Sequence, residues 1–277
     1  MDNSNEILEN HIRITINNML EENKEFIQRE EDSYQSKVLE NPQYKRVLKY
    51  CTDIRNDFIS ALQLMSMYSS RTAYYENSLT IFMIDEIIES LVGVDVLVKE
   101  GIHNTCRREL RYQLELVVKL TIIDINNQEL SLNDKLVYLK NNVPNSSIDY
   151  IDEIILPFNN SENKQFTDEV KDLYKKLCAY VHPSAKQLND RINNYKKGAT
   201  IGFESFQMLE KISKELFRTY DIVLVLMLYG LGQSMSADLF INGFDCFEKW
   251  KFHKGKYVAL YSKLFDYKSG RQTQLKM

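Results

Sequence analysis

The apolar residues of this chain recur with the period of α-helices. Leu8, Ile12, Ile16 and Met19 lie three or four positions apart and so share one helix face. The same period predicts helices over residues 43–70, 78–99, 105–124, 131–143, 167–180 and 203–232. Residues 12–16 and 92–98 also alternate as a strand would, but both stretches are too short to outweigh the helical period. We therefore expect a helical protein.

Turn-forming residues mark several of the predicted helix ends. Pro42 breaks the first helix and opens the second. Gly101 ends the third helix, and Ser131 opens a short one. Residues 145–165 are rich in Asn and Ser and predict a loop with one helical turn. Residues 185–202, which include an Asn pair and a glycine, predict an irregular excursion between two helices.

The predicted helix over residues 203–232 is the longest and the most apolar. It is hydrophobic almost all round near residues 223–228, which places it at the centre of a bundle. The side chains expected in the core are Val223, Leu224, Leu226 and Met227. The sequence thus predicts an all-α protein, an up-and-down helical bundle. Its expected parts are an N-terminal helical arm at residues 1–42, a bundle domain at 43–236 and a C-terminal segment at 237–277.

Composition narrows the class of protein further. Of 277 residues, 44% are hydrophobic and 27% are charged, as in an ordinary globular protein, which argues against wholesale disorder. Nine glycines and four prolines are few for a many-stranded sandwich or barrel. The net charge of −4 neither requires nor excludes a nucleic-acid partner.

The sequence lacks the motifs of several enzyme classes. It contains no GxGxxG, GxxxxGK[ST], HExxH or GxSxG, so nucleotide-dependent enzymes, metalloproteases and serine hydrolases have no support. No CxxC occurs, and His11, His103 and His253 lack acidic residues at ligand spacing. We expect neither a metal site nor a cofactor.

The N-terminal residues and the longest apolar run indicate the cellular compartment of the protein. The first ten residues are polar and acidic, unlike a secretory signal. The longest apolar run, residues 222–231, has ten residues, whereas spanning a bilayer takes about 20. We therefore expect a cytoplasmic protein that has no membrane partner.

A charged stripe runs along the predicted helix over residues 105–124. At 100° per residue, its members fall within about a third of the helix circumference. They are Arg107, Arg108, Arg111, Glu115 and Lys119. Two interpretations remain open. The stripe is either a structural network, since Arg111 and Glu115 are spaced to pair with each other, or the wall of a cleft that binds an anion or another ligand.

The helix predicted over residues 167–180 ends in the sequence YVHPS. His182 precedes a proline, so it lies where the helix must stop, and the negative end of the helix dipole favours its protonated form. Ser184 adds a hydroxyl two residues later. His182 is either a structural hydrogen-bonding residue or a catalyst.

A charged Arg/Glu helix followed by a helix that ends in YVHPS resembles bacterial all-helical proteins of the HEPN-like kind. The resemblance covers residues 75–235 and implies metal-independent RNA cleavage, commonly across a dimer interface, in toxin–antitoxin or phage-defence systems. His182 matches the histidine of the HEPN motif, whereas Lys175 and Lys176 stand at the arginine positions. The resemblance implies catalytic roles for His182, Lys176 and Arg108. It implies binding roles for Arg111, Glu115, Tyr180, Ser184 and Lys175.

The C-terminal residues 248–277 are basic and aromatic. They contain eight Lys or Arg against two acidic residues, a balance of +6, with Trp250, Tyr257 and Phe265 among them. This segment either follows an RNA backbone and stacks on bases, or is a final helix whose rings pack on the bundle. The acidic N-terminal arm offers it a further partner, within one chain or across a dimer.

Two functions from different classes are therefore expected. The first is an effector or accessory module of a bacterial toxin or phage-defence system that binds or cleaves RNA, as a homodimer. The second is a catalytically inert helical module that binds a partner protein, such as an antitoxin or a defence component. They differ in whether His182 and a cation converge in an open cleft.

Overall fold

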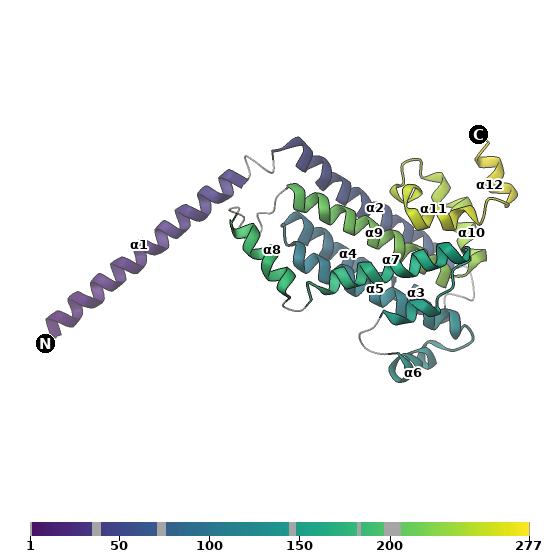
Figure 1. Cartoon of the computed structure of the whole chain (residues 1–277), viewed down its shortest axis with the longest axis horizontal. Helices are drawn as coiled ribbons and strands as arrows, with labels where there is room; N and C mark the ends of the chain where they lie inside the picture. Colours follow the sequence, from purple (N-terminus) through teal and green to yellow (C-terminus); the bar gives the residue numbers. More distant parts are fainter. Residues whose placement is uncertain are drawn as a thin grey trace. The chain divides into compact units, whose positions relative to one another are not determined.

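The computed structural model describes residues 2–34, 40–70, 76–143, 148–181, 184–196 and 206–276 (Figure 1). In these ranges the chain is helical and has no strand, so the all-α prediction is confirmed. The α-helices are α1 (Asp2–Tyr34), α2 (Pro42–Ser69), α3 (Leu79–Phe82), α4 (Ile84–Lys99), α5 (His103–Asn126), α6 (Leu132–Asn142), α7 (Asn160–Cys178), α8 (Ala185–Lys196), α9 (Phe206–Gly230), α10 (Gln233–Asn242), α11 (Lys256–Lys263) and α12 (Ser269–Gln274). Short 3₁₀-helices are η3 (Asp149–Glu153), η4 (Phe244–Cys246) and η5 (Lys251–Lys254).

The chain divides into two compact units, residues 1–47 and residues 48–277. The first consists of α1 and the start of α2. Helix α1 is continuous through residues 12–16 and reaches Tyr34, so the strand-like alternation there belongs to a helix. Helix α2 begins at Pro42 as predicted, because the Asn41 side chain accepts a hydrogen bond from the amide of Gln43 at 2.8 Å.

The second unit is a helical bundle built around α5 and α9, which pack against each other (Figure 1). Helix α9 also contacts α10 and α11, while α5 contacts α3, α4, α6 and α7. Val223, Leu224, Leu226 and Met227 are all fully buried, which confirms the prediction that this segment is central. Among the described residues, no helix combines the length and apolar composition that crossing a bilayer requires.

Local capping places three helix boundaries differently from the periodic pattern. Met83 separates α3 from α4, where one helix was predicted. Helix α7 starts at Asn160, seven residues before the predicted start, because Asn159 and Glu162 form a capping box. The prediction of an irregular excursion is wrong for residues 185–196, which form α8. Ser184 begins that helix, since its Oγ accepts from the amide of Gln187 at 3.1 Å.

The aromatic C-terminal residues pack inside the second unit. Trp250, Tyr257 and Phe265 are buried, and the Trp250 ring stacks on Phe244 with centroids 4.5 Å apart. The packing interpretation of this segment is therefore confirmed. Stacking of Trp250 or Tyr257 on RNA bases is contradicted, because neither ring faces solvent. Several cations of the segment are also paired internally, among them Lys256 with Glu169 at 2.6 Å.

A buried carboxylate joins this segment to the central helix. Asp221 on α9 accepts hydrogen bonds from the amides of Tyr257 at 2.9 Å and Val258 at 3.0 Å, the first turn of α11. A carboxylate at a helix N-terminus satisfies amides that have no partner within the helix. Burial raises the pKa of Asp221 to about 6.

Candidate functional site

Two arginines of the charged stripe on α5, Arg108 and Arg111, face the end of α7. Arg108 Nε donates to the carbonyl oxygen of Tyr180 at 2.6 Å. One turn further along α5, Arg111 donates to Tyr174 Oη at 2.8 Å and to Cys178 Sγ at 3.3 Å. Two arginines from one helix therefore hold the end of another, next to the YVHPS sequence.

Part of the stripe is an internal network. Glu115 accepts from Arg111 at 2.9 Å and from Tyr174 Oη at 3.0 Å, and its other oxygen pairs with Lys119 at 2.7 Å. Burial, and then the nearby Glu115 carboxylate, raise the pKa of Tyr174 to about 12, so this hydroxyl stays a donor at neutral pH. The structural interpretation of the Arg111–Glu115 pair is confirmed.

Arg107 points into the bundle core. Its side chain is only 2% exposed, and its Nε lies 2.7 Å from Glu215 Oε2 on α9. Nη1 donates to Asn104 at 3.2 Å, and the guanidinium lies over the Tyr180 ring, 4.5 Å from its centroid. A buried guanidinium needs such partners because it stays charged. Arg107 therefore links α5, α9 and the end of α7.

Tyr180 contacts α8, and Ser184 contacts the end of α7. Tyr180 Oη donates to Asp190 on α8 at 3.1 Å, and Lys186 Nζ lies 5.4 Å from the Tyr180 ring centroid. Burial raises the pKa of Tyr180 to about 12. Ser184 Oγ donates to the carbonyl of Ala179 at 2.7 Å, so this hydroxyl serves the backbone. His182 lies outside the described residues, between Val181 and Ser184 in sequence.

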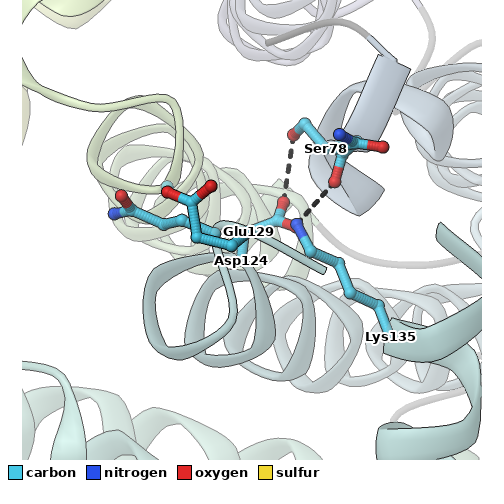
Figure 2. Close-up of a pocket in the computed structure, with 7 residues that line it drawn as sticks. Ser78, Asp124, Glu129 and Lys135 are labelled. Atoms are coloured by element: carbon cyan, nitrogen blue, oxygen red, sulfur yellow. Dashed lines mark hydrogen bonds and ion pairs between the residues drawn. The ribbon is translucent and has the colours of Figure 1, made fainter. Parts of the chain in front are cut away.

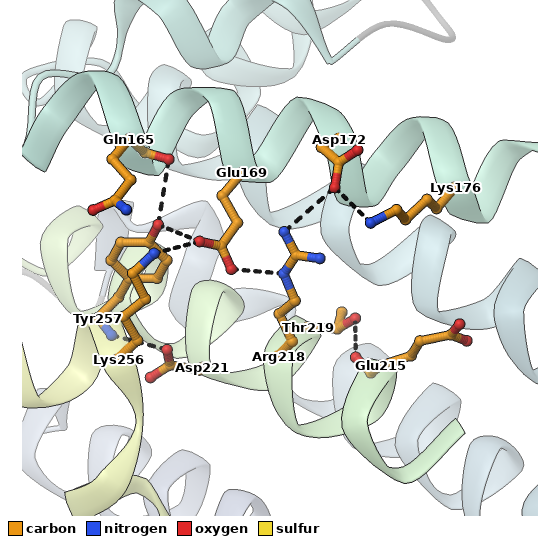
Figure 3. Close-up of polar contacts among 10 residues, drawn as sticks. All are labelled: Gln165, Glu169, Asp172, Lys176, Glu215, Arg218, Thr219, Asp221, Lys256 and Tyr257. Atoms are coloured by element: carbon orange, nitrogen blue, oxygen red, sulfur yellow. Dashed lines mark hydrogen bonds and ion pairs between the residues drawn. The ribbon is translucent and has the colours of Figure 1, made fainter. Parts of the chain in front are cut away.

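The structure does not bring Lys176 to Arg108. Lys176 pairs with Asp172 at 2.8 Å, and Asp172 also lies 3.5 Å from Arg218 of α9 (Figure 3). At 100° per residue, Lys176 is about 160° around α7 from Cys178, which contacts α5. Lys175 is exposed on the same helix. Lys176, at one of the two HEPN arginine positions, therefore does not share a site with Arg108.

Arg108 is the cation of the stripe that remains open to a ligand. Its side chain is exposed, and only Nε is used by the contact with Tyr180. In the part of the chain that the structure describes, neither Nη atom of Arg108 has a hydrogen-bond or ion-pair partner. A guanidinium with free terminal nitrogens binds phosphate or carboxylate oxygens in a planar, paired geometry.

Sequence reasoning missed three groups beside these residues. Glu215 and Asp190 come from α9 and α8, and no spacing within the α5 or α7 sequence points to them. His103 lies one turn before Arg107 and is buried, and neither of its ring nitrogens is hydrogen-bonded to a described residue. Burial, and then the Arg107 charge, lower the pKa of His103 to about 4, so its imidazole is neutral at physiological pH.

Neither metal ligation nor similarity to known proteins adds to this picture. Among the described residues, no three His, Cys, Asp or Glu side chains gather closely enough to hold a metal ion. Comparison with protein-family models, with curated proteins and with solved structures finds no match.

Proposed function

We propose that this protein is a HEPN-like module that binds or cleaves RNA without a metal ion, as an effector or accessory component of a bacterial toxin or phage-defence system. The residues concerned form the α7–α8 junction site, which comprises Arg108, Tyr180, His182, Ser184 and Lys186. One observation carries the proposal. Arg108 is fixed by Nε to the carbonyl of Tyr180, two residues before His182, while its terminal nitrogens have no partner among the described residues.

The proposed chemistry assigns binding and proton transfer to different side chains. Arg108 holds the non-bridging oxygens of a phosphate, and Lys186 adds positive charge from α8. His182 takes the proton of the ribose 2′-hydroxyl, because an imidazole titrates near the working pH. The 2′-oxygen then forms a bond to phosphorus, and the bond to the 5′-oxygen breaks. The products are a 2′,3′-cyclic phosphate and a 5′-hydroxyl, with the proton returned to the leaving oxygen.

The cleavage test uses a 5′-labelled single-stranded RNA and the full chain in the presence of EDTA. We expect His182→Ala to abolish cleavage while RNA is still bound, and Arg108→Ala to weaken binding. Lys140→Gln, which removes an exposed charge from α6, is the matched control and is expected to cleave normally. Cleavage by the His182→Ala variant at the wild-type rate would refute the catalytic role.

A homodimer is part of this proposal, because the resemblance implies a site that faces its copy across an interface. Helix α4 offers an apolar surface for such a contact, where Val92 and Val96 are 47% and 53% exposed. Light scattering after size exclusion is expected to give about twice the mass of 32.6 kDa. Val96→Asp is expected to shift that mass to the monomer, with Lys140→Gln again as the control.

A second candidate is the catalytically inert interaction module. It is favoured by the internal pairing of Arg107, Arg111 and Lys119, which leaves the stripe little free charge. The two candidates separate in one experiment. If the wild-type chain neither binds nor cleaves RNA at low ionic strength, the interaction module becomes the leading function.

A further inference from the structure

A cavity of about 250 Å³ opens at the far end of α5 from the α7–α8 junction site. It is lined by Asn77, Ser78, Asp124, Gln128, Glu129, Lys135 and Gly230, which come from four parts of the fold (Figure 2). Asp124 and Arg108 are 16 residues apart on α5, a separation of about 24 Å along the helix. The volume is that of about eight water molecules, enough for a small metabolite.

The base of the cavity is the buried ion pair between Asp124 and Lys135. The acceptor sites of the Asp124 carboxylate are already used by hydrogen bonds within the protein. Lys135 Nζ lies 2.9 Å from Asp124 Oδ1, and both side chains are 3% exposed or less. The Asp124 carboxylate also accepts from the amides of Leu79 and Thr80, at 3.0 and 2.9 Å, and from Ser78 Oγ at 3.0 Å. Four hydrogen bonds use the acceptor sites of a carboxylate, so Asp124 has none left for a ligand or a metal ion.

Lys135 has one donor left. An ammonium has three N–H groups, and those of Lys135 reach Asp124 Oδ1 and the carbonyl of Asn77. No other acceptor for this ammonium is found among the described residues. A ligand oxygen that enters the cavity can therefore accept the third hydrogen bond of the Lys135 ammonium, which is buried and held in place.

The mouth of the cavity carries an unpaired carboxylate among the described residues, whereas the base carries a cation with a free donor. Glu129 and Gln128 are exposed there, and Figure 2 shows the Glu129 carboxylate standing apart from the Asp124–Lys135 pair. Within the described ranges Glu129 has no ion-pair partner. Among the described residues, the lining carries two carboxylates and one ammonium, a formal charge of −1. Glu129 is thus positioned to pair with a ligand cation.

We propose that this cavity binds a small, flexible molecule that carries an oxygen acceptor at one end and a protonated amine or guanidinium at the other. A net charge of +1 complements the lining, and free basic amino acids are the simplest molecules with this pattern. The oxygen end would meet Lys135 and the cationic end Glu129. None of the described lining residues has an aromatic side chain to stack on a planar heterocycle, which disfavours nucleobases.

The test is titration calorimetry of the full chain with L-arginine and L-lysine. We expect both to bind, and L-glutamate to bind at least about tenfold more weakly, because its second carboxylate would face Glu129. Agmatine, which keeps the guanidinium but lacks the carboxylate, is expected to bind more weakly than arginine. None of these readouts involves RNA, so the result does not depend on the proposed function.

Glu129→Gln is the informative variant, because Glu129 is exposed and its loss leaves the buried pair intact. We expect it to weaken arginine binding at least about tenfold without changing the thermal unfolding midpoint of the free protein. Lys140→Gln, an exposed position on the same helix as Lys135, is the control and is expected to bind normally. The proposal fails if neither basic amino acid binds at millimolar concentration, if glutamate binds as tightly, or if Glu129→Gln binds like the wild type.

Discussion

Gly255 occupies a position that has no room for a side chain. A Cβ added there would lie well inside contact distance of Asp221 Oδ1, which is held by the first amides of α11. We expect Gly255→Ala to lower the free energy of unfolding by about 1–3 kcal/mol, measured by urea denaturation, since the carboxylate or the turn must shift. Gly93→Ala in α4 is the control.

Gly93 has open space where a Cβ would be placed, and it lies in the middle of a helix. Alanine there is expected to be neutral or to stabilise by up to about 1 kcal/mol, because it restricts the unfolded chain more than glycine does. If both variants unfold at the same urea concentration, Gly255 is not confined as described.

Asp221 makes stability depend on pH in a defined direction. Its pKa in the folded protein is about 6, above the ordinary value of 3.8, because burial disfavours the carboxylate. The folded state therefore binds more protons than the unfolded state between about pH 4 and pH 6. The contribution of this group to stability is full below about pH 4 and is lost as the pH rises through 6.

The measurement compares wild type with Asp221→Asn by urea denaturation at several pH values. Wild type is expected to lose stability relative to the variant as the pH rises from about 4 to about 6, by a free energy on the order of 1–3 kcal/mol. A difference between the two proteins that stays constant across this range would show that Asp221 titrates normally.

An ion pair inside the bundle joins α5 and α9. Arg107 is buried and Glu215 is about one-fifth exposed, so removing the glutamate leaves a guanidinium in the core without its carboxylate. We expect Glu215→Ala to lower the free energy of unfolding by about 3 kcal/mol. The double variant Arg107→Met, Glu215→Met is expected to recover much of that loss, because no buried charge remains.

The control for this pair is Lys214→Ala on the neighbouring position of α9. Lys214 pairs with Glu210 on the surface, where both side chains are well exposed. Exposed pairs contribute little, so a change below about 1 kcal/mol is expected. Similar losses for Lys214→Ala and Glu215→Ala would contradict the burial argument.

The helical period was sufficient to predict most elements, since it reports which face each helix buries. It located α5 and α9 within a few residues. It missed α8, which is polar and begins at the Ser184 cap. The resemblance, not the helical period, grouped Lys176 with Arg108, whereas Lys176 pairs with Asp172 one turn earlier on α7. Partners from distant segments, such as Glu215, leave no local signal.

The net charge of −4 affects how the whole protein would bind RNA. Binding at the α7–α8 junction site is expected to be confined to a few phosphates and to weaken as salt rises. Arg108→Ala is expected to lower the slope of log affinity against log salt by about 0.7 on single-stranded RNA. Lys140→Gln is expected to leave the slope unchanged, and an equal change in both variants would indicate non-specific attraction.

The four bonds of Asp124 have a consequence for how the bundle opens. The amides of Leu79 and Thr80 depend on this carboxylate, and its charge is balanced by Lys135 from α6. If α6 detaches, an uncompensated charge is left in the interior, so α3 and α6 should open together as one cooperative unit. Hydrogen exchange at those two amides would then report the departure of α6, although both amides are hydrogen-bonded to Asp124 and not to α6.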